Sequence, residues 1–264
     1  MTKDWSLFKY IRLLVLLFIL FIVAVDAWLD RARSTDWNNT LTVVIVPVNP
    51  EASEVVDRYI ADLNADDLQP IAKFFDREAG KYIPIKTSAF KFLVGEELHE
   101  QAPELKPNAQ WFDAVVWSLR SRHWVYQKRK KYKHLFPDIM LFVNYYDPAE
   151  HNRVRHSVGL EKGLYGIVYG FGNSINKKQN HIVIAHELLH TLGASDKYEP
   201  SSNQPLFPIG YAERDKQPLY PQSKAELMAG RVPIDAGTSF MPESLNDVVI
   251  GPETALEINW LKTL

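Results

Sequence analysis

The chain has 264 residues, with 30 basic and 32 acidic side chains, 46% hydrophobic residues and no cysteine. This length is enough for one packed domain, and the near-neutral charge provides no field that would attract nucleic acid, so no nucleic-acid partner is expected. The lack of cysteine excludes disulfides, iron–sulfur clusters and a cysteine nucleophile, so any metal must be held by His, Asp or Glu.

The N-terminal region carries a membrane signal. Residues 13–25 read LLVLLFILFIVAV, and their apolar neighbours extend the predicted transmembrane signal anchor to residues 10–29. Basic side chains precede this run, so residues 1–9 are expected in the cytoplasm and the rest of this single-pass protein on the extracytoplasmic side, with the lipid bilayer as a partner. The alternative is a signal peptide cleaved near Ala27, which would give a secreted protein.

A polar tether over residues 30–40 is expected to lead into one domain spanning residues 41–264. The sequence LTVVIVPV at 41–48 is rich in β-branched residues and predicts a buried strand. Apolar residues at helical spacing predict helices over 51–63 and 68–78.

The middle of the chain predicts further alternation of strand and helix. A second strand is expected within 82–94, a helix over 110–127 and a buried strand over 138–145. A further strand is expected over 164–171, where Gly166 and Gly170 suggest a sheet edge or a place where another backbone comes close. The stretch 120–133 reads RSRHWVYQKRKKYK, and its basic residues indicate either a solvated helix end or a surface that meets anionic lipid headgroups.

The last third of the chain changes character. Residues 180–192 read NHIVIAHELLHTL, which predicts a helix that is apolar around most of its circumference. Half of the chain's 16 prolines fall within 200–252, so little regular structure is expected there before a final helix over 253–261. The sequence thus predicts an α/β (α+β) domain with an upper subdomain, 41–192, and an irregular lower subdomain, 193–264.

The predicted buried helix carries the residues that indicate chemistry. His186 and His190 are four residues apart, so their imidazoles project from one helix face and can bind one ion. His181 lies about 140° around the helix axis from His186 and is not expected to be a co-ligand. Glu187 falls beside the ion, where its carboxylate can take a proton from a water molecule.

The residues after this helix supply a third ligand. Gly193 stands where a left-handed residue would let the chain turn sharply, and Asp196 follows within reach of the two histidines. Three protein ligands leave a fourth position for water, as a catalytic zinc ion requires. Glu213 and Glu226 are alternative third ligands from a later segment.

The eleven residues from His186 to Asp196, HELLHTLGASD, resemble the HExxHxxGxxH signature of the metzincin zinc metallopeptidases, in a variant with Asp in place of the third His. The resemblance implies that His186, His190 and Asp196 bind Zn²⁺ and that Glu187 is the general base. It also implies a twisted mixed sheet above the active-site helix and an irregular lower part that ends in a helix.

Metzincins also have a methionine turn below the metal, for which Met228 is the candidate and Met241 the second choice. The same resemblance implies that the strand at 164–171 forms the sheet edge that pairs with a substrate peptide. No pattern identifies an oxyanion stabiliser, and Tyr198 and Tyr220 are the candidates considered.

Together these features predict a membrane-anchored zinc metallopeptidase that hydrolyses a peptide or protein substrate with a Glu-activated, zinc-bound water. Two alternatives stay open. One is a membrane-tethered binding or scaffold protein whose metal site is structural or vestigial. The other is a zinc amidase that acts on a non-peptide amide.

Overall fold

The computed structural model of the chain describes residues 9–18, 21, 25, 34–84, 87–105, 109–161 and 163–262. Of the predicted anchor over 10–29, residues 10–18, 21 and 25 are helical and exposed, and the others lie outside the described residues. Residues 1–8 and the first part of the predicted tether, 30–33, also lie outside them. Within the part of the chain that the structure describes, none of the helices combines the length and apolarity needed to cross a bilayer.

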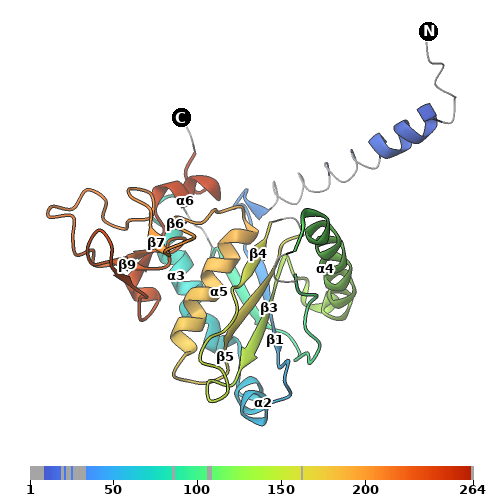
Figure 1. Cartoon of the computed structure of the whole chain (residues 1–264), viewed down its shortest axis with the longest axis horizontal. Helices are drawn as coiled ribbons and strands as arrows, with labels where there is room; N and C mark the ends of the chain where they lie inside the picture. The colour runs from blue at the N-terminus through green and yellow to red at the C-terminus, as the bar shows by residue number, and fades with distance from the viewer. Residues whose placement is uncertain are drawn as a thin grey trace, which may run out of the picture.

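A five-stranded mixed sheet forms the centre of the domain, with strand order β2-β1-β3-β5-β4 (Figure 1). The parallel strands are β1 (Leu41–Val48), β2 (Phe90–Val94), β3 (Ile139–Tyr146) and β5 (Tyr165–Phe171). The last strand, β4 (Val158–Leu160), pairs antiparallel with β5. The predicted α/β class and mixed sheet are therefore confirmed.

The prediction that the strand near 164–171 forms the sheet edge is wrong. β5 lies between β3 and β4, so the edge belongs to β4, in which Gly159 pairs with Gly166. β4 has only three residues and is partly exposed, so it carries no apolar run that a pattern could reveal.

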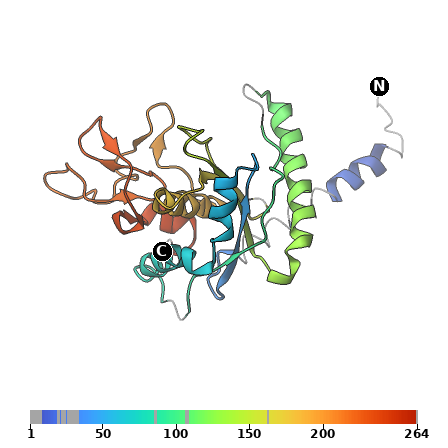
Figure 2. The same cartoon turned by 90° about the horizontal axis from the view of Figure 1, so that it is seen from below.

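Helices cover both faces of the sheet (Figure 2). On one face lie α2 (Glu54–Ala61), α3 (Gln69–Ala79) and α5 (Lys177–Thr191), which share a core with Val43 and Ile45 of β1. The opposite face is covered by α4 (Trp111–Lys131), which packs with Val44 and Val46. β1 therefore needs apolar residues on both of its faces, which explains its unbroken hydrophobic run.

The predicted helices are present with shifted ends. The helix expected over 110–127 extends to Lys131, and the one expected over 180–192 begins earlier, at Lys177. The last helix, α6 (Pro252–Glu257), is shorter than the 253–261 expected. The structure adds three short 3₁₀ helices: η1 (Ala65–Leu68), η2 (Lys133–Leu135) and η3 (Leu245–Asp247).

The lower part of the domain contains more pairing than its prolines suggested. Three two-residue ladders are present: β6 (Tyr198–Glu199) with β7 (Gln204–Pro205), β8 (Ala225–Glu226) with β11 (Val248–Val249), and β9 (Val232–Pro233) with β10 (Ser239–Phe240). Each ladder is too short to produce a periodic pattern in the sequence.

Side chains at the end of α3 and just after it form hydrogen bonds with the lower part of the domain. The buried carboxylate of Glu78 accepts a hydrogen bond from the Ile250 amide at 2.9 Å, and the Tyr82 hydroxyl donates to the Ile250 carbonyl at 2.7 Å. The Arg77 guanidinium donates to the carbonyls of Leu245 and Val248. These bonds join residues more than 160 positions apart, so the segment below the metal-ligand candidates is held against α3.

Candidate metal centre

The two histidines of the HExxH sequence lie together on one face of α5. The helix is anchored by buried apolar residues, among them Ala185, Leu188 and Leu189. His186 and His190 project from the remaining face, where their side chains are 15% and 18% exposed. Their Nε2 atoms are 3.1 Å apart, so helical spacing has placed two potential ligand atoms at one point.

Asp196 completes a group of three. Gly193 takes the left-handed conformation with φ of 94°, and this turn returns the chain over the end of α5. The Asp196 Oδ1 atom lies 3.2 Å from His186 Nε2 and 3.2 Å from His190 Nε2. The three residues proposed as ligands from the sequence are thus brought together.

Backbone carbonyls fix the orientation of both imidazoles. His186 Nδ1 lies 2.9 Å from the Leu227 carbonyl, and His190 Nδ1 lies 2.8 Å from the Ala194 carbonyl. Because a carbonyl only accepts, each Nδ1–H donates to its carbonyl, and the two Nε2 atoms are left facing each other and Asp196. Two imidazole nitrogens at this separation require a cation between them, either a proton or a metal ion. A carbonyl partner for the second ring nitrogen is also the usual arrangement of metal-binding histidines.

The spacing of the three atoms fits a zinc ion. Ligands bound to zinc at about 2.0–2.1 Å with tetrahedral angles are separated by roughly 3.3 Å, and the separations here are 3.1–3.2 Å. The electrostatics agree with this fit. Burial would lower the pKa of His186, but Asp196 and Glu187 raise it overall. Burial would raise the pKa of Asp196, but the two histidines hold it well below its usual range. The site therefore favours a positive charge at its centre.

Glu187 lies beside this group, inside the protein. Its side chain is almost fully buried, and burial raises the pKa of its carboxyl group, an effect that the two histidines oppose. The carboxylate interacts with the Gly159 amide of β4, whereas Oε2 has no hydrogen-bond partner among the described residues. A buried carboxylate oxygen without a partner is costly, so its retention next to three ligand candidates suggests a chemical role.

Gly159 brings the edge strand directly onto α5. A Cβ atom at this position would lie 2.3 Å from the Glu187 carbonyl oxygen and 2.5 Å from the His190 Cβ. Only a glycine allows β4 to approach this closely. No pattern in the sequence marks Gly159, because its importance depends on a contact with residues about 30 positions away.

A tight turn supports the group from below. Leu227 provides the carbonyl for His186, and the adjacent Met228 is completely buried. The buried carboxylate of Glu226 organises this turn by accepting hydrogen bonds from the amides of Met228 and Ala229 at 2.6 and 3.0 Å. Met241, the second choice for a methionine turn, is 45% exposed.

The alternative third ligands lie elsewhere. Glu226 also accepts hydrogen bonds from the Thr254 hydroxyl and the Gly251 amide, so its oxygens are committed to the lower part of the domain. Glu213 accepts from the Ser223 amide at 2.7 Å and pairs with Lys216. Neither carboxylate belongs to the histidine group, whereas Asp196 does.

The two tyrosine candidates differ in position. The Tyr198 hydroxyl faces the Asp196 carboxylate, and burial together with this carboxylate raises the pKa of Tyr198. The Tyr220 hydroxyl instead lies 2.8 Å from the hydroxyl of Tyr211. Tyr198 is thus the tyrosine that the structure places beside the ligand group.

A clamp that the sequence did not reveal holds both neighbours of Asp196. The Lys197 ammonium is buried and lies 2.7 Å from Glu257 Oε2 at the end of α6. The same carboxylate accepts hydrogen bonds from the Ser195 amide at 3.0 Å and the Ser195 hydroxyl at 2.6 Å. With Ser195 and Lys197 both tied to Glu257, the position of Asp196 is set by the C-terminal helix.

A hollow of about 330 Å³ adjoins the group, and His190, Gly193 and Gly159 contribute to its lining. Ser118 and Arg122 of α4 form the opposite wall. This hollow offers space for a side chain of a bound ligand next to the three ligand candidates.

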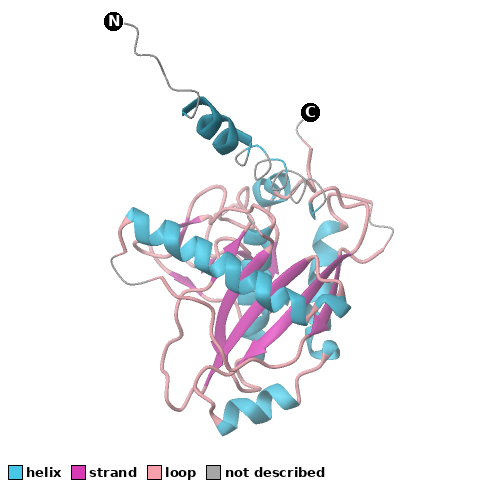
Figure 3. Ribbon diagram, turned by 90° about the vertical axis from the view of Figure 1, so that its right-hand side faces the viewer, coloured by secondary structure: helices cyan, strands magenta, loops and turns pink. Residues whose placement is uncertain are grey.

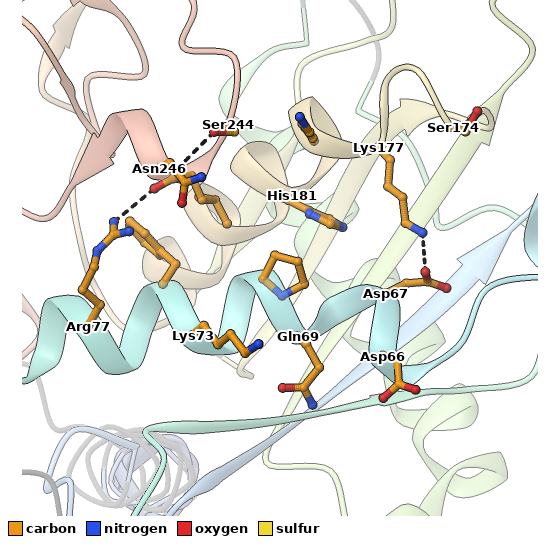
Figure 4. Close-up of a pocket in the computed structure, with 14 residues that line it drawn as sticks. Asp66, Asp67, Gln69, Lys73, Arg77, Ser174, Lys177, His181, Ser244 and Asn246 are labelled. Atoms are coloured by element: carbon orange, nitrogen blue, oxygen red, sulfur yellow. Dashed lines mark hydrogen bonds and ion pairs between the residues drawn. The ribbon is translucent and has the colours of Figure 1, made fainter.

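A separate groove of about 780 Å³ runs between α3 and α5 (Figure 4). His181 lines it, as does Lys177, which pairs with Asp67. Burial lowers the pKa of His181 to about 4, so this imidazole is neutral. His181 thus faces away from His186, as its helical spacing predicted.

Acidic residues gather around two other histidines. Glu51 and Glu150 lie near His151, and Asp57 and Glu97 lie near His99. These groups combine segments distant in sequence, which the search for ligand spacing did not detect. Half of their members are exposed, and exposed acidic groups are common without a bound ion.

No family model matches the chain, and no curated protein matches it either. The function therefore has to be argued from the geometry of the site itself.

Proposed function

We propose that this chain is a zinc-dependent metallopeptidase of metzincin type. The observation that carries the proposal is the convergence of His186 Nε2, His190 Nε2 and Asp196 Oδ1 within 3.1–3.2 Å of one another, with both imidazoles oriented by carbonyls. The buried carboxylate of Glu187 next to them provides the second element of the chemistry.

His186, His190 and Asp196 would hold the ion. When bound, zinc polarises the scissile carbonyl and lowers the pKa of water towards about 7. Glu187 takes the proton as the water oxygen bonds to the carbonyl carbon. It then delivers that proton to the leaving nitrogen as the C–N bond breaks, so it ends the cycle in its starting state. The raised pKa of Glu187 suits the first step, because it makes the carboxylate a better proton acceptor than an exposed glutamate.

The edge strand supports a peptide as substrate. One side of β4 pairs with β5, and its other side is one of the two edges of the sheet in the described residues, where the Gly159 amide faces Glu187. An extended peptide can add to such an edge through main-chain hydrogen bonds. The contact of Gly159 with Glu187 and His190 would bring that peptide directly over the ligand group.

We also propose that the domain is tethered to a membrane with its N-terminus in the cytoplasm. Support comes from the helical residues 9–18, where Leu14 is 66% exposed and Phe18 is 63% exposed. Large apolar side chains on all sides of a helix suit a lipid environment. A secreted form cleaved near Ala27 is the alternative.

Hydrolysis and metal content, measured together, test the proposed chemistry. Purified without chelator, the wild-type chain should contain one zinc ion and cleave denatured protein. Glu187→Gln should keep the zinc and lose roughly 10²–10⁴-fold in rate, because the proton acceptor is removed and the ligands are unchanged. His190→Ala should lose both zinc and activity, and Glu253→Gln, which changes a partly exposed side chain on α6, should lose neither.

Each other outcome selects a different function. Full activity in Glu187→Gln would remove Glu187 as the base. A zinc-loaded wild type that cleaves no protein but releases a non-peptide amide would favour the amidase alternative. A well-folded wild type that binds no added zinc would favour a binding or scaffold protein.

A further inference from the structure

Helix α4 presents an apolar outer face, and Figure 3 shows that it crosses the front of the sheet. Trp124 and Val125 of α4 are buried against the sheet. Beyond Trp111 at its first position, which is 80% exposed, α4 has an outer stripe, defined by five apolar residues with exposed fractions from 45% to 62%: Phe112, Val115, Val116, Leu119 and Tyr126. Their spacing of three, four and seven residues puts them on one helix face, which is normally polar on a surface helix. An apolar patch of this kind marks an interaction surface.

A cationic hollow continues this stripe at the C-terminal end of α4. It measures about 320 Å³, and its lining includes Tyr126, Arg129, Lys130, Lys133 and Phe136. The Lys130 ammonium lies 4.4 Å from the Tyr126 ring centre, and Phe136 is 80% exposed. Aromatic rings and ammonium groups are thus presented together to the outside.

The charge of this face is unbalanced. α4 contains six Lys or Arg residues and one acidic residue, Asp113, which caps the start of the helix. Lys128 and Lys131 pair with Glu100 and Glu96, respectively. Lys130 and Lys133 have no acidic partner among the described residues, so the hollow is open to an anionic group.

We infer that the outer stripe of α4 and its cationic hollow dock on a lipid bilayer that contains anionic lipids. Apolar and aromatic side chains at the boundary of acyl chains and headgroups, with Lys and Arg beside lipid phosphates, are the features of an interfacial helix. The inference concerns a surface other than the metal centre and stands without the hydrolytic function.

A second apolar surface favours the bilayer over a protein partner. The helical residues 9–18 also expose large apolar side chains, and they lie on the same side of the domain as α4 (Figures 1 and 2). One membrane can cover both surfaces at once, and its anionic headgroups match Lys130 and Lys133 in the hollow beside the outer stripe. Because Ser118 and Arg122 of α4 line the hollow beside His190, docking would also hold the metal centre close to the membrane surface.

The chain lacks cysteine, which allows a single label to report on this contact. We would label Leu119→Cys on the outer stripe and, as the matched control, Ile175→Cys, an apolar position that is 87% exposed in the loop before α5. The full chain is reconstituted into phosphatidylcholine vesicles with or without phosphatidylglycerol. Fluorescence quenching by aqueous iodide and by nitroxide-bearing lipid is measured for each label.

With phosphatidylglycerol present, the Leu119 label should be severalfold less accessible to iodide than the Ile175 label, and the nitroxide lipid should quench the Leu119 label alone. Adding Lys130→Glu and Lys133→Glu should abolish most of that lipid quenching. Equal iodide accessibility of the two labels in vesicles would overturn the inference. So would unchanged lipid quenching in the double Lys→Glu variant. Protection of the Leu119 label that rises with the protein-to-lipid ratio, without quenching by nitroxide lipid, would also overturn it, because that result indicates a second copy of the chain as the occupant.

Discussion

The clamp around Asp196 gives a quantitative test of how the metal centre is held. Glu257→Gln removes the negative charge that faces the Lys197 ammonium. The Lys197 side chain is only 2% exposed, and its remaining partners are the hydroxyl and carbonyl of Ser195. Loss of one member of a fully buried pair costs about 3–5 kcal/mol. Since the Glu257 side chain is 31% exposed and water screens it, we expect about 2–3 kcal/mol.

For a domain of this size, that loss corresponds to a melting temperature lower by roughly 5–10 °C. It should also weaken zinc binding by about 10–100-fold, because Asp196 would lose the restraint on both of its neighbours. Melting followed by circular dichroism and zinc affinity from competition with a chromophoric chelator measure the two effects. Glu253→Gln is the matched control, since it breaks an exposed ion pair with Arg214 on the same helix and should cost less than about 1 kcal/mol. If Glu257→Gln behaves like Glu253→Gln in both measurements, Glu257 does not hold Asp196 in place.

Three further predictions concern pH, packing and metal removal. Burial alone would raise the pKa of Glu257, but its bonds to Lys197 and Ser195 lower it. The stabilising contribution of Glu257 is therefore complete above pH 4.5, the ordinary pKa of a glutamate, and is lost as the pH falls through its pKa in the folded state. The difference in unfolding free energy between wild type and Glu257→Gln should therefore shrink in acid. Gly159→Ala should displace β4, lower stability by more than about 1–3 kcal/mol and abolish hydrolysis, whereas Gly237→Ala, with its nearest contact at 3.9 Å, should be neutral in both assays. Chelation of zinc should lower the wild-type melting temperature and should leave that of His190→Ala unchanged. The loss is equivalent to about 4 kcal/mol if zinc was present at a thousand times its Kd. An equal response of the two proteins would argue against the site.

The central strands could be predicted because their environment is uniform. β1, β3 and β5 lie inside the sheet with helices on both faces, so nearly every position is apolar and the runs are visible in the sequence. β4 shows the opposite case. Its three residues form a strand only because β5 offers a partner, and the pattern of VGL alone contains no such information.

The lower part of the domain shows the same division. Its prolines correctly indicated that long helices and strands would be scarce. The ladder between β8 and β11 could not be predicted, because it joins two residue pairs more than 20 positions apart. The Glu226 carboxylate, considered from the sequence as a metal ligand, is used instead to organise the turn at Met228. A sequence reveals the residue type but not which neighbours the fold supplies.

The local part of the candidate metal site follows from the sequence alone. His186, Glu187, His190 and Asp196 fall within eleven residues, and helix geometry followed by a glycine turn places them without help from the rest of the chain. The tertiary structure alone decided which carbonyls orient the imidazoles, which strand edge lies above them and which helix restrains Asp196. Helical periodicity depends on residues a few positions apart, so a sequence pattern can reveal it. The hydrogen bonds between Leu227 and His186 and between Glu257 and Ser195 instead span 41 and 62 positions, and they exist only in the packed chain.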